Sequence, residues 1–283
     1  AFTGGCHHSG ACENFQNSCG NCKSYLLNPS EKDISNSQLT RKKEIYENIP
    51  ITVVGCSQWI AERAQKSSVF KNKMVVSIPN PLDLDVFKPI KVDKQEFGFI
   101  SDKKYILIAA MKVTVIWKGF GFLKEALKLF SQKLTELEKN NIEILVAGDA
   151  NPVDFEDIPF NWNLLGRINS PKKMNQVYNL ADVFVSSSIQ ENLPNTIMEA
   201  MAAGTPCVAF GVGGIPEMIE HKNTGYVAEP ENSDDLADGI KFVFENKSDI
   251  PFGINSRKKV IENYSNEVVA GEYLELYRNV LKN

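Results

Sequence analysis

The 283-residue sequence predicts an α/β protein built around a parallel β-sheet. From Tyr105 onward, short apolar runs of strand length alternate with amphipathic runs of helix length, which is typical of a parallel sheet with helices on both faces. Apolar residues make up 43% of the chain and charged residues 23%, the proportions of a globular protein. The length is ample for two domains, so we expect more than one hydrophobic core.

The first hundred residues contain few expected elements. A polar stretch rich in Asn and Ser covers 28–40, and two prolines flank Asn80 further on. Those prolines leave no room for a regular element, which predicts a crossing between two domains. The elements expected before this crossing are a basic helical segment at 41–46, a strand at 51–54, a helix at 58–66 capped by Ser57, and a strand at 74–78.

The remainder of the chain alternates regularly between strands and helices. Six strands are expected, at 105–109, 142–147, 162–165, 183–186, 207–210 and 226–227. Helices are expected at 121–138, 171–180, 194–203, 216–220 and 233–244, with a terminal amphipathic helix capped by Ser265 at 265–282. Ligands of such sheets bind at the carboxyl ends of the strands, so we expect the functional side chains there.

The segment 186–206 carries the strongest functional signal. It ends an apolar strand, places Glu191 in a loop, and places Glu199 on a short helix that Pro194 would open and Gly204 would close. The first amides of such a helix lack partners and carry a partial positive charge, which suits a phosphate. Carboxylates accept hydrogen bonds from sugar hydroxyls. A nucleotide sugar on this segment would place its diphosphate at the helix tip, its hexose near Glu191 and its ribose near Glu199.

The same segment carries a family resemblance. The run E-N-L-P-N-T-I-M-E-A-M-A-A-G-T-P-C-V-A-F, followed by G-G-I-P-E-M-I and T-G-Y-V, resembles glycosyltransferase family 4. Members of that family are retaining nucleotide-sugar transferases of the GT-B fold, which has two Rossmann-like domains with parallel sheets. The opening A-F-T-G-G-C-H-H is similar to bacterial enzymes that build surface polysaccharides. The resemblance covers nearly the whole chain and implies that the backbone at Asn192 and Leu193 contacts the sugar and diphosphate.

Further donor contacts are implied by the resemblance. Lys118 matches the K-G step of the family and would oppose the charge of the leaving diphosphate. The family has Arg where this chain has Trp117, so either Lys112 supplies the missing charge or phosphate binding is weaker. The residues expected to be catalytic are Glu191 and Lys118, and those expected to bind donor are Glu199, Asn192, Leu193, Lys112, Gly119, Arg167, Gly166 and Pro194, with Gly166 and Arg167 at the nucleobase.

The resemblance also suggests how the chain is divided. Residues 1–88 would form part of an N-terminal, acceptor-side domain, and residues 89–255 the nucleotide-sugar-binding domain. Residues 256–283 would form a helix that either crosses back to the first domain or packs on its own. Family members carry an H-D-x-W strand end and a Gly-rich loop ahead of the point where this sequence opens. We therefore expect a truncated N-terminal domain and a chain that by itself is unable to catalyse.

Charge and composition limit the partners. A net charge of −4 argues against a general nucleic-acid binder. No apolar run approaches the length that spans a membrane, so we expect a cytoplasmic protein, with Arg41-Lys42-Lys43 leaving open a peripheral contact with the inner membrane face. No cofactor or catalytic metal is expected, because the D-x-D motif of Asp83 and Asp85 lies in the domain crossing rather than at a strand end.

Cysteines crowd the N-terminus. Cys19 and Cys22 have the local spacing of a structural zinc site, whereas the outer spacings are less usual. Reduced thiols and disulfides remain the alternatives. The tentative metal cluster consists of Cys6, Cys12, Cys19 and Cys22, with His7 and His8 beside the first.

These features together predict a retaining glycosyltransferase that acts in polysaccharide biosynthesis. It would move a hexose from a nucleoside-diphosphate sugar to a glycan or a lipid-linked sugar. The alternatives are a sugar-nucleotide epimerase of the same fold and an inactive donor-binding fragment, since fold alone does not fix function. An epimerase would convert the nucleotide sugar without any acceptor.

Overall fold

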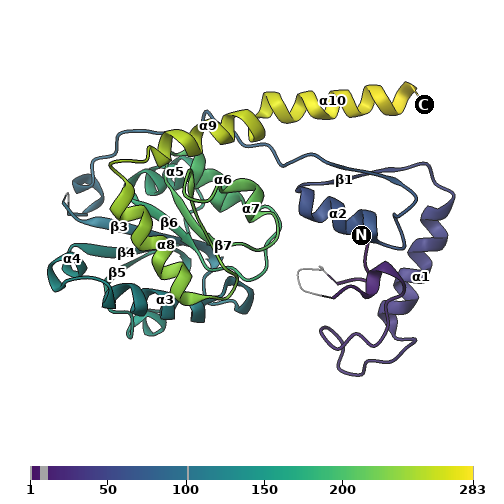
Figure 1. Cartoon of the computed structure of the whole chain (residues 1–283), viewed down its shortest axis with the longest axis horizontal. Helices are drawn as coiled ribbons and strands as arrows, with labels where there is room; N and C mark the ends of the chain where they lie inside the picture. Colours follow the sequence, from purple (N-terminus) through teal and green to yellow (C-terminus); the bar gives the residue numbers. More distant parts are fainter. Residues whose placement is uncertain (1, 7–11, 101, 283) are drawn as a thin grey trace. The chain divides into compact units, whose positions relative to one another are not determined.

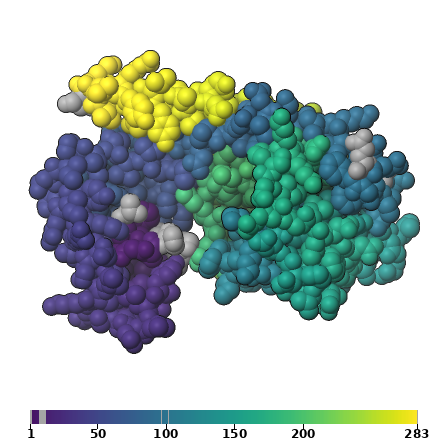
Figure 2. Space-filling model, turned by 180° about the vertical axis from the view of Figure 1, so that it is seen from behind, coloured from purple at the N-terminus to yellow at the C-terminus, as the bar shows by residue number. Residues whose placement is uncertain are grey.

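The chain forms two compact units in the computed structural model, which describes residues 2–6, 12–100 and 102–282 (Figure 1). The first unit contains residues 1–80 and 271–283, and the second contains residues 81–270. The division falls inside α10 (Asn266–Lys282). Figure 2 shows the second unit, coloured teal to green, as one closely packed body.

A six-stranded parallel sheet forms the centre of the second unit, with the order β5-β4-β3-β6-β7-β8. Because every neighbouring pair is parallel, all strands end at the same edge of the sheet. All four residues of β7 are buried, so both faces of the sheet are covered there. The strands confirm the six that were predicted: β3 (Lys104–Lys112), β4 (Ile142–Asp149), β5 (Asn161–Gly166), β6 (Val183–Ser186), β7 (Cys207–Phe210) and β8 (Gly225–Ala228).

Helices pack on this sheet and on one another. Two long helices, α3 and α8, pack together, and α8 also contacts β6, β7 and β8. The α6 helix contacts β6 and β7 and packs against α5 and α9. The helices of this unit are α3 (Phe120–Gln132), α4 (Glu136–Asn140), α5 (Pro171–Leu180), α6 (Asn195–Ala202), α7 (Ile215–Met218), α8 (Ser233–Asn246), α9 (Phe252–Tyr264) and the start of α10.

Local capping explains where two of these helices depart from the prediction. The helix predicted at 121–138 is interrupted, because Thr135 forms a reciprocal capping box with Glu138 and starts α4 as a separate helix. The helix predicted to open on Pro194 begins at Asn195 instead, with Pro194 as its extended N-cap residue. The α9 helix was not predicted.

The first unit has a smaller core around a two-stranded parallel sheet of β1 (Thr52–Gly55) and β2 (Met74–Ser77). As predicted, Ser57 caps α2 (Gln58–Lys66) by accepting a hydrogen bond from the Ile60 amide at 3.1 Å. The α1 helix (Ile34–Glu47) begins well before the helical segment predicted at 41–46, inside the polar stretch 28–40. Its start is set by Asp33, whose side chain accepts from the amides of Ser35 and Asn36.

Asp33 also ties α1 to the preceding loop. Its carboxylate accepts a hydrogen bond from the Cys22 amide at 2.9 Å and another from the Ser35 hydroxyl at 2.6 Å. These bonds, the one from Cys22 first, hold the pKa of Asp33 at about 2. The carboxylate therefore stays charged and keeps the loop attached to the helix.

The boundary between the units lies after Asn80 rather than after residue 88. Residues 81–88 group with the second unit because Phe87 is buried there, with its ring 6.4 Å from that of Tyr178. The Lys88 amide donates to the Asn175 side chain at 3.1 Å. Arg257 in α9 donates to the Phe87 carbonyl, which also holds α9 in the second unit.

Membrane-spanning segments were sought among the helices of the described ranges. None of these helices combines the length and the apolar character that a bilayer crossing requires.

Candidate functional site

Three loops, which follow β3, β6 and β7, meet at the carboxyl edge of the sheet. The Ile189 amide donates to the Trp117 carbonyl at 2.9 Å, which joins the loops after β6 and β3. The Gly214 amide donates to the Asn192 carbonyl at 2.7 Å, which joins the loops after β7 and β6. Backbone hydrogen bonds thus fix all three loops where ligands of parallel sheets bind.

Two glycines permit this close approach. Gly119 has a φ of +63°, and a Cβ atom there would collide with the Ser187 carbonyl oxygen. Gly213 has a φ of +59°, and a Cβ atom there would collide with the Glu191 carbonyl oxygen. Residues with a side chain rarely adopt such φ values, so the loop contacts require glycine at both positions.

Lys118 and Glu191 form an ion pair in this region, with the Lys118 ammonium donating to the Glu191 carboxylate. Their side chains are 31% and 15% exposed, so the pair is partly withdrawn from water but still reachable. The Ser187 hydroxyl donates to the Lys118 carbonyl at 2.9 Å and holds the lysine's backbone in place. Both residues were predicted to be catalytic, and the fold brings them into contact.

The N-terminus of α6 follows directly after Glu191. Leu193 is buried and anchors the loop, while Asn192 is held through its carbonyl by Gly214. Pro194, the N-cap residue, provides no side-chain hydrogen bond to the first turn of the helix. The positive end of the α6 dipole therefore lies next to the ion pair without a side-chain cap from its N-cap residue.

Glu199 lies on α6 in a different environment. Its carboxylate accepts a hydrogen bond from the Tyr178 hydroxyl at 2.9 Å. Burial raises the pKa of Glu199, and the hydrogen bond from Tyr178 opposes that shift. Tyr178 is fully buried, and its pKa is raised well above the usual value by burial and by the charge of Glu199.

Tyr178 was missed by the sequence analysis. Its position in α5 marks it as part of the buried helix face, and it packs against Phe87 and Phe184 like any core aromatic. No pattern within α5 signals that its hydroxyl reaches a carboxylate on another helix.

The predicted nucleobase residues, Gly166 and Arg167, lie at the end of β5. Arg167 pairs with Asp149 at 2.9 Å, and both side chains are about half exposed. Gly166 has a φ of +65° at the end of β5, which allows the chain to turn there. Lys112, at the end of β3, is exposed and in register with Asp149. These residues share the carboxyl edge with the Lys118–Glu191 pair but end different strands.

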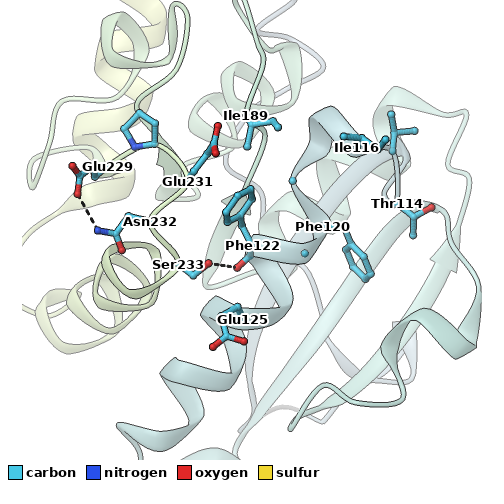
Figure 3. Close-up of a pocket in the computed structure, with 14 residues that line it drawn as sticks. Thr114, Ile116, Phe120, Phe122, Glu125, Ile189, Glu229, Glu231, Asn232 and Ser233 are labelled. Atoms are coloured by element: carbon cyan, nitrogen blue, oxygen red, sulfur yellow. Dashed lines mark hydrogen bonds between the residues drawn. The ribbon is translucent and has the colours of Figure 1, made fainter. Parts of the chain in front are cut away.

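A cavity of about 1040 Å³ opens beside the loop after β3, and neither Lys118 nor Glu191 is among its lining residues (Figure 3). Gly119 and Ile189, which line it, are chain neighbours of Lys118 and Gln190. Figure 3 shows the loop after β3 and the start of α3 on one side and the turn before α8 on the other, joined by a 3.0 Å hydrogen bond from Ser233 to the Phe122 carbonyl. The side chains that line the cavity include both aromatic rings and carboxylates: Phe120, Phe122, Glu125, Glu229 and Glu231.

The four N-terminal cysteines lie together in the first unit, where they line one cavity of about 600 Å³. Burial raises the pKa of Cys19, with smaller contributions from Cys6, Cys12 and Cys22 and an opposing hydrogen bond from the Gly4 amide to its sulfur. The predicted neighbours His7 and His8 lie outside the described residues. Within the described ranges, no three His, Cys, Asp or Glu side chains are arranged so that they could hold a metal ion.

Comparisons with known proteins identify the family. Residues 91–266 match the family described as Glycosyl transferases group 1. The uncharacterized glycosyltransferase MJ1607 of Methanocaldococcus jannaschii is 30% identical over 74% of this chain and 54% of its own length. The N-acetyl-alpha-D-glucosaminyl L-malate synthase of Bacillus anthracis is 27% identical over 75% of this chain and 55% of its own length. This chain thus spans about half the length of these relatives.

A solved structure shows the same fold. The Anabaena protein HepE, in complex with UDP, matches 86% of this chain and 68% of its own chain with a TM-score of 0.72 and 18% identity. This likeness confirms the predicted α/β architecture of the GT-B class. The match over residues 91–266 covers the sheet, the ion pair and α6. The chain belongs to the glycosyl transferases group 1 family.

Proposed function

We propose that this chain contains the donor site of a retaining glycosyltransferase of family 4. The enzyme moves a hexose from a nucleoside-diphosphate sugar to a glycan or a lipid-linked sugar during polysaccharide biosynthesis. The observation that carries the proposal is the Lys118–Glu191 ion pair beside the N-terminus of α6, in a chain of the group 1 family.

The ion pair and the helix provide the groups that a diphosphate needs. Lys118 turns from Glu191 toward the diphosphate when donor binds, and the first amides of α6 add their partial positive charge. Both then stabilise the negative charge that develops on the diphosphate as the sugar–phosphate bond breaks. Fixed donors of this kind can fulfil the role that a metal ion has in other transferases.

The two glutamates hold the two sugar rings. Glu191, released from Lys118, accepts hydrogen bonds from the hexose hydroxyls, and Glu199 accepts them from the ribose. Tyr178 is a positioning residue, because its hydroxyl holds the Glu199 carboxylate. The backbone at Asn192 and Leu193 contacts the sugar and diphosphate, Gly119 places Lys118, and Gly166 and Arg167 contact the nucleobase.

Retention follows from how the proton is handled. The bond between the hexose anomeric carbon and the diphosphate oxygen breaks, and that oxygen takes the proton of the acceptor hydroxyl. The acceptor oxygen then bonds to the anomeric carbon on the face that the diphosphate left. The departing nucleoside diphosphate is therefore the base, and no protein carboxylate has to attack the sugar.

The comparisons guide the choice of nucleobase to test and bear on the epimerase alternative. UDP is the first nucleotide to test, because HepE binds it. The epimerase alternative is not favoured, because the matching family and the related proteins are glycosyltransferases. The donor-binding alternative is separated from transfer by the assay that follows.

A transfer assay tests the proposal. The chain is incubated with α-linked UDP-hexoses, with and without short oligosaccharides or polyprenyl-diphosphate sugars, and the anomeric configuration of the product is read by proton NMR. Any product should be α-linked and should form only with acceptor. A β-linked product would overturn retention, and conversion of the donor without acceptor would support an epimerase. Donor binding without any product would limit the function to donor binding.

A further inference from the structure

We propose that the cavity of about 1040 Å³ beside the loop after β3 is a subsite for a neutral sugar residue of the acceptor, a role that rests on the proposed function and narrows its acceptor to an uncharged oligosaccharide. Of the residues predicted to bind donor or to catalyse, only Gly119 lines this cavity. The nucleotide therefore has its expected contacts elsewhere, and the cavity is available to the second substrate.

The walls of the cavity are held in place by the fold. The helices α3 and α8 pack together, and the Ser233 hydroxyl donates to the Phe122 carbonyl at 3.0 Å. Asn232 caps the first turn of α8, and its side-chain amide donates to Glu229 at 2.9 Å. A site that is already formed loses little freedom when a ligand binds. Its volume is at the upper end of the roughly 300–1,000 Å³ of small-molecule sites, which is enough for a disaccharide.

Two aromatic rings provide an apolar surface in this cavity. Phe120 and Phe122 are half-buried, with their rings 5.1 Å from Phe155 and 6.0 Å from Phe210, respectively. Each ring is thus anchored on the core while its exposed part lines the cavity. Figure 3 shows both rings between the turn before α8 and Thr114. The face of a sugar ring that carries mainly C–H bonds packs well on such rings.

The polar groups of the cavity suit hydroxyls and disfavour anions. Glu125, Glu229 and Glu231 line it, and among the described lining residues none is Lys, Arg or His. The side chains of Glu125 and Glu231 are exposed and have no hydrogen bond or ion pair in the described part of the chain. Their oxygens can therefore accept hydrogen bonds from sugar hydroxyls, whereas a phosphate or a uronate would be repelled.

The cavity is continuous with the loops that carry the ion pair. Gly119 follows Lys118 directly, and Ile189 lies two positions before Glu191. Backbone hydrogen bonds hold these loops together, as described above. A glycan whose reacting hydroxyl lies at the ion pair would thus extend its next sugar residue into the cavity.

This arrangement restricts the acceptor. A diphosphate attached directly to the acceptor sugar would meet the carboxylates of the cavity, so a single lipid-linked sugar fits poorly. An acceptor with at least two neutral sugar residues fits, and an earlier sugar transfer has to supply it.

Ligand-observed NMR titration of the full chain tests the subsite. The probes are maltotriose, mannotriose and chitotriose, which are neutral, and trigalacturonate, which is anionic. At least one neutral trisaccharide should bind about tenfold or more tightly than trigalacturonate, because like charges oppose the latter. Binding of none of the neutral trisaccharides, or equal or tighter binding of trigalacturonate, would overturn the proposal.

Gly121→Trp locates the binding in this cavity. Gly121 lines the cavity, and a Cβ atom there meets nothing within 4 Å, so the indole can occupy the space without straining the helix. Affinity for the neutral trisaccharide should fall about tenfold or more through steric exclusion. Gly271→Trp is the matched control, because Gly271 on α10 is equally open and lies outside the cavity. Equal affinities in the two variants would place the binding elsewhere and overturn the proposal.

Glu125→Gln provides a second variant of unchanged shape. It should weaken the neutral trisaccharide about threefold, because a charged acceptor becomes neutral, and should bring trigalacturonate closer to it. A selectivity that stays unchanged would remove Glu125 from the subsite and overturn the charge argument. UDP is titrated against the same unaltered chain. UDP binding without trisaccharide binding would overturn the subsite alone, and trisaccharide binding without UDP binding would overturn the donor site alone.

Discussion

Glu191 and Glu199 are the same residue type in one motif, yet their surroundings are opposite. Glu191 lies in a loop and pairs with the cation of Lys118. Glu199 lies on α6, is partly buried, and pairs with the neutral hydroxyl of Tyr178. Glu191 has a cation as its partner, whereas burial makes the charged form of Glu199 costly. Under the proposed function, this difference leaves Glu191 to exchange Lys118 for the donor sugar and Glu199 to recognise the ribose.

Lys118→Ala should have the largest effect, because it removes the cation that opposes the leaving diphosphate. The rate of transfer should fall about 10²- to 10³-fold, the range seen when a fixed transition-state donor is removed. Lys124→Ala is the control, because Lys124, which lies on α3, pairs with Asp157 and has no assigned role in the reaction. A fall of only a few-fold in the Lys118 variant, equal to that in the control, would remove Lys118 from the reaction.

Gly119→Ala should break the loop contact that places Lys118. The alanine would have to keep a φ of +63° while its Cβ collides with the Ser187 carbonyl, so the free energy of unfolding should fall by about 2 kcal/mol or more. Urea denaturation measures this change. Gly121→Ala is the matched control on α3, where a Cβ meets nothing within 4 Å. The control should be neutral or stabilising by up to about 1 kcal/mol, and equal losses in both variants would contradict the account.

Glu199→Gln should weaken donor binding about tenfold, since a charged acceptor becomes a neutral one of the same shape. The loss should be smaller for 2′-deoxy-UDP, which lacks one of the hydroxyls that Glu199 would accept. Calorimetric titration of both nucleotides against the variant and the unaltered chain gives the comparison. Equal losses for the two nucleotides would remove Glu199 from the ribose.

Donor affinity should fall below a certain pH, here called the acid limit, and this limit should reflect the raised pKa of Glu199. Ribose binding needs the carboxylate, so affinity should fall, as the solution is acidified, at a pH above that of an ordinary glutamate. Tyr178→Phe removes the bond that opposes the shift, so the limit should move to still higher pH, with a few-fold loss at most at neutral pH. Dissociation constants across the acidic range measure this.

The free energy of unfolding should also depend on Glu199, but it should fall as pH rises, whereas donor affinity should increase. The pKa of Glu199 is higher in the folded chain than in the unfolded chain. Glu199 therefore adds to the free energy of unfolding at pH values below its pKa in the unfolded chain. This contribution is lost as pH rises through its pKa in the folded chain. Glu199→Gln should abolish both dependences. An acid limit that persists in Glu199→Gln would assign it to another group.

The sequence predicted the regular elements of the second unit well. The strands at 183–186 and 207–210 and the helix at 171–180 have the predicted bounds, because apolar runs there are bounded by proline, glycine or a capping serine. The start of α1 was wrong, because residues 34–40 are polar and show no helical period. Its start depends on Asp33, whose cap is strengthened by a bond from Cys22, eleven positions earlier.

The candidate site was predictable in its residues but not in its contacts. The family resemblance identified Lys118 and Glu191 separately, but their pairing depends on two loops that only the folded sheet brings together. The role of Tyr178 is visible only once α5 packs on α6. Long-range hydrogen bonds, and close approaches such as that of Gly119 to the Ser187 carbonyl, produce no periodic pattern in the sequence.

The most direct test of the donor site compares a nucleoside diphosphate with its monophosphate. UDP and UMP are titrated calorimetrically against the unaltered chain and against Lys118→Ala, with ADP and GDP and their monophosphates alongside. We predict that one nucleoside diphosphate binds more tightly than its monophosphate. Lys118→Ala should remove most of this difference in affinity, which we call the margin, and should leave the affinity for the monophosphate unchanged. A margin that survives in Lys118→Ala, or no binding of any of these nucleotides, would contradict the account.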